Sequence, residues 1–131
     1  MTSFGRIGGR RSLSGLSALL IMSPCAAHHS YAMFDITKTV TLQGTVKQYQ
    51  WSNPHCYIQL LVAAPSASAE WSIEMSSTGD VYRGGWRPGT FRPGDKVTVV
   101  VHPTRDGTNG GSFVSAVGSG GESLVSRKAT Q

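Results

Sequence analysis

The stretch VTLQGTVKQYQW, residues 40–51, is the most informative part of this sequence about its fold. Four positions alternate along one face of an extended strand: Val40, Leu42, Gly44 and Val46. Tyr49 and Trp51 then continue on the opposite parity, and a bulge near Lys47 and Gln48 explains the change, because one extra residue shifts the alternation by one. A long, bent first strand can take part in both halves of a closed sheet, and this favours a small barrel.

Four further segments alternate with period two and are separated by turns rich in glycine and proline: residues 56–62, 69–75, 97–101 and 113–117. Residues 77–84 are the one helical segment, begun by Ser77 and ended at Gly84. This order predicts an all-β fold, a five-stranded OB-like (oligonucleotide/oligosaccharide-binding) partly open barrel with one short helix between strands 3 and 4. A small sandwich is the alternative.

Large aromatic side chains are expected to supply much of the core of so small a domain: Trp51, Trp71, Trp86, Phe91 and Phe113. In the third strand, Trp71 and Ile73 alternate with Glu70 and Glu74, so the tryptophan is predicted to face inward. If it is fully buried, Trp71→Ala costs about 3–5 kcal/mol of stability.

The amino-terminal residues 1–27 have the pattern of a cleaved signal peptide. A basic region with Arg6, Arg10 and Arg11 precedes the apolar run 13–22, and the small residues 25–27 follow. Cleavage after Ala27 exposes His28 as the new amino terminus. We therefore expect an exported protein, soluble in the periplasm, with a single domain over residues 28–125 and a frayed tail over 126–131. The pattern leaves the export route open between the general and the twin-arginine pathway.

Processing changes both the charge and the cysteine count. The formal net charge of +5 falls to +2, because three arginines leave with the signal and nine basic and seven acidic residues remain. So low a charge, with export, argues against nucleic acid as a partner. Cys25 also leaves, so Cys56 has no intrachain partner and is expected to be a buried thiol. Beyond the signal, the sequence predicts no membrane span.

The predicted amino terminus indicates a metal site. A terminal histidine can chelate through its α-amine and its ring nitrogen together, and nitrogen ligands of this kind suit copper. His29, His55 and His102 are the other candidate ligands, and Met33 can add a thioether. An alternative stays open, in which residues 31–34 form a strap that packs on the barrel, with Met33 and Phe34 as core residues.

The two body histidines lie in short motifs next to strand ends. In WSNPH, residues 51–55, the Asn-Pro turn would hold His55 at the rim of the barrel, where it could bind a metal. If His55 has only a structural role, it is a hydrogen-bonded turn residue. In HPTRDG, residues 102–107, His102 has the opposite parity to Val101 and need not share its face. Arg105 and Asp106 are expected to fix this loop by a local ion pair.

An ordered set of motifs over the mature chain resembles a known family. These motifs are HHSYAMFD (28–35), GTV (44–46), W-x-NPH (51–55), EW (70–71), GW (85–86), PGD (93–95) and HPTRDG (102–107). They are similar to a family of exported bacterial proteins of unknown function whose members open with an HHSFAMFD-like motif. The resemblance implies export and a small β-barrel, and it supplies no reaction.

Two functions remain in view from the sequence. The first is a periplasmic metal-binding protein, with copper as the expected metal, bound by His28 with body histidines. The alternative is a non-enzymatic OB-like module that binds a small ligand or a partner protein. We expect no enzymatic activity, because no nucleophile–base arrangement is present. A weaker third hypothesis is oxidative chemistry at a copper ion held by a histidine brace, that is, by the terminal histidine together with a second histidine. The oligomeric state is left open.

Overall fold

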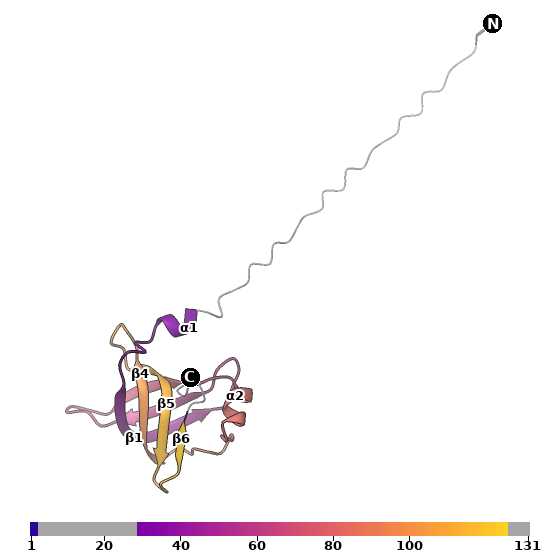
Figure 1. Ribbon diagram of the computed structural model, residues 1–131. Coiled ribbons are helices and arrows are strands. Elements are labelled where there is room, and N and C mark those ends of the chain that lie inside the picture. Colours follow the sequence, from indigo (N-terminus) through magenta and orange to yellow (C-terminus); the bar gives the residue numbers. More distant parts are fainter. Residues whose placement is uncertain (3–28, 126–131) are drawn as a thin grey trace.

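The computed structural model describes residues 1–2 and 29–125 (Figure 1). Their elements are, in chain order, α1 (His29–Ala32), β1 (Val40–Gln50), β2 (Tyr57–Val62), β3 (Ala69–Glu74), α2 (Thr78–Arg83), β4 (Lys96–Pro103), β5 (Gly110–Gly118) and β6 (Ser123–Val125). The expected signal peptide and carboxy-terminal tail lie outside the described residues. Among the described residues, no helix has the length and hydropathy of a membrane-spanning segment.

Five strands form a closed barrel, as the long first strand predicts. β1 pairs with both β2 and β4, and the chain of pairings runs β3-β2-β1-β4-β5. The ring closes because β3 and β5 also pair, in parallel, over Ser72–Glu74 and Gly110–Ser112. The expected barrel with one short helix between strands 3 and 4 is confirmed, and it is closed rather than partly open.

The predicted bulge in the first strand is present. The register of β1 against β2 shifts between Val46 and Gln48, and Tyr49 then pairs with Ile58, which is fully buried. The bulge therefore moves Tyr49 and Trp51 onto the core side, where both pack against the core cluster. The first half of β1 pairs with β4 and its second half pairs with β2, so the bend joins the two halves of the barrel.

One early strand start and one additional strand are the main differences from the sequence prediction. β5 begins at Gly110 rather than Phe113, because Gly110–Ser112 hydrogen-bond with β3 where the barrel closes. β6, in the polar glycine-rich stretch after residue 118, was not expected, and it pairs with β5 outside the ring. Neither segment has the apolar alternation that marks a half-buried strand.

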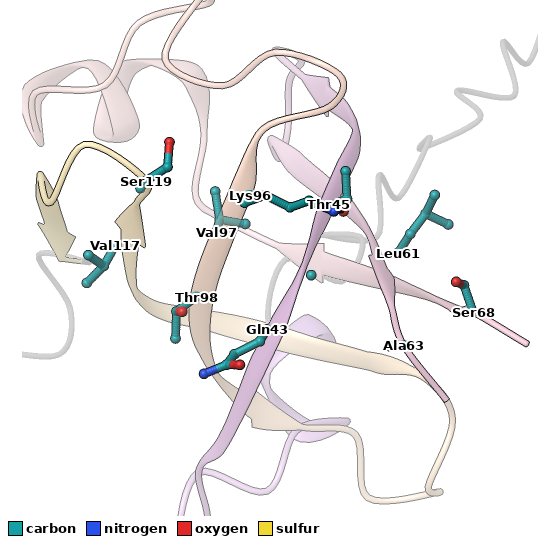
Figure 2. A pocket seen from close by; sticks show the side chains of 12 residues that line it. Gln43, Thr45, Leu61, Ala63, Ser68, Lys96, Val97, Thr98, Val117 and Ser119 are labelled. Carbon is teal, nitrogen blue, oxygen red and sulfur yellow. Dashed lines mark hydrogen bonds between the residues drawn. The ribbon is translucent and has the colours of Figure 1, made fainter. Parts of the chain in front are cut away.

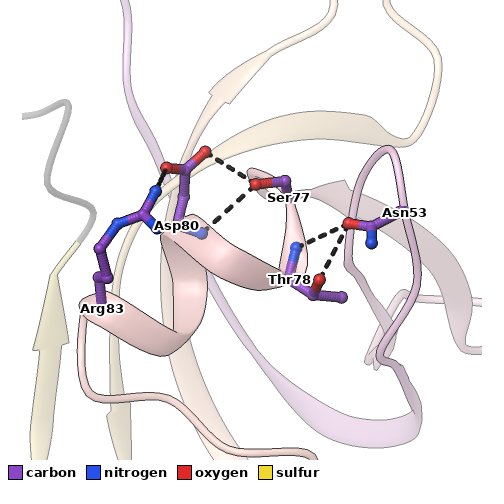
Figure 3. A network of polar contacts seen from close by, with 5 residues as sticks. All are labelled: Asn53, Ser77, Thr78, Asp80 and Arg83. Carbon is purple, nitrogen blue, oxygen red and sulfur yellow. Dashed lines mark hydrogen bonds and ion pairs between the residues drawn. The ribbon is translucent and has the colours of Figure 1, made fainter.

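The short helix α2 has the expected ends. The Ser77 side chain accepts a hydrogen bond from the Asp80 amide at the amino end, and Gly84 is the carboxy-terminal cap. Figure 3 shows that Asn53, in the β1–β2 loop, also meets this end. Its Oδ1 accepts from the Thr78 amide at 3.1 Å and from the Thr78 hydroxyl at 3.0 Å. The loop that carries the WSNPH motif is thereby tied to α2.

The core is aromatic at its centre and aliphatic along the strands. Trp86, Phe91 and Phe113 are buried, and Trp86 makes edge-to-face contacts with both phenylalanines. Trp51 and Trp71 are only partly buried and pack against the edge of this cluster. Trp71 thus lies on the predicted face of β3, but it is not the fully buried residue that the alternation suggested.

Candidate functional site

The segment that leads to the expected metal-binding terminus is fastened to the end of β4. His28 lies outside the described residues, and His29 is the first residue of α1. After α1, Phe34 forms an isolated antiparallel bridge with Thr104. The Asp35 amide donates to the Pro103 carbonyl at 2.8 Å, and the Arg105 amide donates to the Met33 carbonyl at 2.8 Å. We call residues 31–38 the amino-terminal segment.

Side chains strengthen this attachment. Phe34 is 3% exposed, so its ring is a buried anchor. Arg105 Nε donates to the Ala32 carbonyl at 3.2 Å, and Asp106 accepts from the Thr108 amide at 3.0 Å. The expected Arg105–Asp106 ion pair is therefore wrong: the arginine holds the amino-terminal segment, and Thr108 holds the aspartate. Hydrogen bonds from Thr108 also lower the pKa of Asp106.

The strap interpretation applies to Phe34 but not to Met33, whose side chain is 49% exposed. Tyr31 is exposed to the same extent and Ile36 to 56%. The segment is thus anchored through its backbone and one ring, and it leaves the Met33 thioether accessible to solvent.

His102 lies directly against the amino-terminal segment. Its Nδ1 is 2.7 Å from the Lys38 carbonyl oxygen. A carbonyl can only accept, so Nδ1 carries the proton, and in the neutral ring Nε2 has a free lone pair. Histidines that bind metals commonly donate their second ring N–H to a carbonyl or a carboxylate in this way.

His55 has the same arrangement with a carboxylate. Its Nδ1 is 2.6 Å from Glu74 Oε1, and its side chain is 31% exposed. The backbone here is fixed by the Ser52 hydroxyl, which donates to the His55 carbonyl at 2.8 Å, and by the Asn53 contacts with α2. The WSNPH motif therefore holds His55 beside the start of β2, as the sequence suggested.

Strand pairing relates the two histidines to each other. His102 pairs with Ser112 on β5, and Ser112 pairs with Glu74 on β3. Because Val101 and Ile73 are fully buried, their neighbours His102 and Glu74 face outward. Two strand spacings of about 4.8 Å separate the His102 and Glu74 backbones by about 10 Å. Within the described residues, no three His, Cys, Asp or Glu side chains come close enough to hold a metal ion.

Some of the site could not be read from the sequence. From the sequence, Glu74 was only an outward residue of strand three. The Lys38 carbonyl is a backbone group, so no residue type in the sequence indicates its contact with His102. Both become visible only through strand register. Cys56 behaves as predicted: it is a free, fully buried cysteine, and burial raises the pKa of its thiol.

The structure also has an open groove of about 700 Å³, lined from β1, β2, β4 and β5 and from the loops that follow β2 and β5 (Figure 2). Lys96 crosses it, and its Nζ donates to the Thr45 hydroxyl at 2.5 Å. Among the candidate metal ligands whose side chains the structure describes, none of Met33, His55 and His102 lines this groove. The candidate site is therefore the surface around His102 and the amino-terminal segment, with His55 farther round the barrel.

Comparison with known proteins gives one match. No curated protein and no solved structure matches the chain. A family model matches residues 18–113, which is well over half of the chain and includes both histidine motifs of the body. The protein therefore belongs to the family of unknown function DUF6152.

Proposed function

We propose that this protein is an exported periplasmic metal-binding protein that binds copper through His28 and His102. The observation that carries the proposal is the geometry of His102. Its Nδ1 is committed to the Lys38 carbonyl, so Nε2 is the nitrogen available to a metal, and the chain running back to His28 is fastened beside it.

The terminus supplies the other two nitrogens. After cleavage behind Ala27, His28 offers its α-amine and its ring Nδ1 in one chelate ring. The α-amine has a pKa near about 7.7–8.0, so a metal displaces its proton readily at neutral pH. With His102 Nε2 this makes three nitrogens, a donor set that suits Cu(II). Met33, exposed in the same segment, can add a soft ligand for Cu(I).

The reach of the chain is compatible with this assignment. Five residues lie between His28 and Phe34, which pairs with Thr104, two residues beyond His102. Four of them form α1, and a helix advances only about 1.5 Å per residue. The terminus therefore stays within roughly 25 Å of the His102 backbone even if the other residues are extended. His55 and His29 remain secondary candidates, and His55 is the farther of the two body histidines from the fastened segment.

Competitive copper titration of correctly processed protein tests the proposal. Three alanines added before His28 keep every side chain, move the α-amine out of the chelate ring and leave no histidine among the first three residues, so affinity should fall by more than about tenfold. His102→Ala should weaken binding to a similar extent. His55→Ala is the matched control, because it removes an imidazole from the same outer surface, and it should leave the affinity close to that of the parent protein. Cu(II) EPR should show nitrogen coordination that His102→Ala reduces.

Two results would contradict this proposal. An affinity no better than that of an unstructured His-His peptide would remove the metal site. No effect of the three added alanines, together with losses of affinity in both His55→Ala and His102→Ala, would show that imidazoles bind without the terminal amine.

A further inference from the structure

A second surface of the barrel, independent of the proposed copper ligands His28 and His102, has the chemistry of a ligand-binding face. Two rows of outward side chains cross β1, β2 and β3. Gln48 pairs with Gln59 and Gln59 with Ser72, whereas Gln50 pairs with Tyr57 and Tyr57 with Glu74. They face outward because Ile58, between the rows on β2, is fully buried. We call these six residues the polar face.

Hydrogen bonds orient the polar groups of this face. Gln59 Nε2 donates to Ser72 Oγ at 3.2 Å and lies 3.5 Å from Gln50 Oε1. Gln50 Nε2 in turn donates to Gln48 Oε1 at 3.3 Å. At the other end, Glu74 accepts from His55 and from the Tyr57 hydroxyl. Burial first, and the Glu74 carboxylate second, raise the pKa of Tyr57, so this hydroxyl stays a neutral donor.

The composition of the polar face restricts what it can bind. It contains no lysine or arginine, and Lys47 at its border is paired with Glu70 at 2.7 Å. An anionic ligand would therefore meet no free cation and one carboxylate. A purely apolar ligand would cover the amides of Gln48, Gln50 and Gln59 and leave their remaining hydrogen-bonding capacity unmet, which is costly. A neutral ligand with many hydroxyl groups fits, because each amide both donates and accepts and the Tyr57 ring can stack on C–H groups.

We propose that the polar face binds a neutral oligosaccharide. Three strands span about 10 Å, and a ligand of disaccharide length or longer can meet both rows at once. His55 borders the face and presents Nε2 as an acceptor for a sugar hydroxyl, because its Nδ1 is held by Glu74. Barrels of this topology use the face of strands 2 and 3 for oligosaccharides in other proteins, which is consistent with the site but does not carry the argument.

Backbone amide chemical shifts of the processed protein test the inference. The probes are cellotetraose, chitotetraose and maltotetraose, each at millimolar concentration, with no copper present. At least one should shift amides of β1–β3 around Tyr57 and Gln59. Tyr57→Ala should raise its Kd about tenfold, as expected for a central aromatic anchor, and Tyr57→Phe should retain most of the affinity. Gln43→Ala, in the groove of Figure 2, is the matched control and should bind as the parent does.

Gln59→Ala keeps the test decisive if Tyr57→Ala does not fold, since it truncates an outward amide and should also weaken binding. The proposal is overturned if none of the three tetrasaccharides shifts these amides. It is equally overturned if binding survives both alanine variants unchanged, or if a sulfated tetrasaccharide or an oligonucleotide binds this face more tightly. A negative result here leaves the copper titration unaffected, because the two experiments share no probe and no variant.

Discussion

At the scale of single residues, the amino-terminal segment depends on a few polar groups. Asp35 accepts from the Thr37 amide and hydroxyl, and its carboxylate pairs with Lys38 at 3.0 Å. These contacts keep the turn between Phe34 and Lys38 in the shape that brings the Lys38 carbonyl to His102. The amino-terminal segment is thus held by contacts on both sides of Phe34 in the sequence.

Asp35 should make stability depend on pH at acidic values. Hydrogen bonds from Thr37, then Lys38, lower its pKa from 3.8 to about 2. A folded-state pKa below the unfolded one contributes stability above the unfolded value, and this is lost as pH falls from about 4 to about 2. Asp35→Asn keeps the turn acceptor but removes the charge. Thermal melts at several pH values should therefore show a smaller loss of Tm over that interval in Asp35→Asn; an unchanged slope would contradict the assignment.

Gly44 should not tolerate a side chain. A Cβ at this position would lie 2.6 Å from the Leu61 carbonyl oxygen and 2.7 Å from Leu60 Cγ, so β2 would have to move. Gly44→Ala should lower the free energy of unfolding by about 1–3 kcal/mol, the usual effect of overpacking. Gly89→Ala is the matched control, because a Cβ there meets nothing within 4 Å. Urea denaturation of both variants measures the difference, and equal midpoints would refute the close approach.

At the scale of elements, the connection from α2 to β4 supplies the central aromatic residues of the core. Val81 on α2 and Phe91 in the connection are buried, and Trp86 between them is 2% exposed. Tyr49, brought inward by the bulge, contacts the rings of Trp86 and Phe91. The short helix therefore serves mainly to place Trp86, and Asn53 ties the same helix to the loop that holds His55.

Two tryptophan variants should separate this central position from the edge of the core. Trp86→Ala should cost about 3–5 kcal/mol, because it truncates a fully buried ring. Trp71→Ala should cost less than about 2 kcal/mol, because part of that side chain is already in water. Denaturant melts compare the two directly. A larger loss for Trp71→Ala would mean that β3, rather than the α2–β4 connection, supplies the central packing.

At the scale of the whole molecule, the barrel fastens a short amino-terminal segment to the end of β4, while the polar face lies across β1–β3. The proposed copper site and the proposed saccharide face thus use different strands of one closed sheet. Only the proposed copper site depends on where the signal peptide is cleaved.

If the protein is exported as proposed, native material should begin at His28. Residues 1–27 supply the basic, apolar and small-residue regions that signal peptidase requires. Intact-mass measurement with and without added copper reports the terminus and the metal stoichiometry together. A mass that corresponds to Ser30 as first residue, or to a chain that retains residues 1–27, would remove the terminal chelate.

Much of the fold was predictable because it depends on local alternation. The parity change after Val46 located the bulge, and Ser77 and Gly84 marked both ends of α2. The early start of β5 and the strand β6 were not predictable, since glycine and polar residues gain strand geometry there from their neighbours. Likewise, the extent to which Trp71 is buried depends on which residues pack over its side chain. The alternation of apolar and polar residues along β3 does not contain that information.

The β-barrel, the family and the presence of histidines next to two strand ends can be inferred from the amino-acid sequence, because side-chain periodicity and turn residues act over a few positions. Which groups meet depends on the folded chain. The Lys38 carbonyl reaches His102 across 64 positions, and Glu74 reaches His55 from another strand. Such contacts are set by strand register and barrel closure, which depend on packing of the whole chain. The same long-range pairing leaves His102 Nε2, rather than Nδ1, as the nitrogen free to bind.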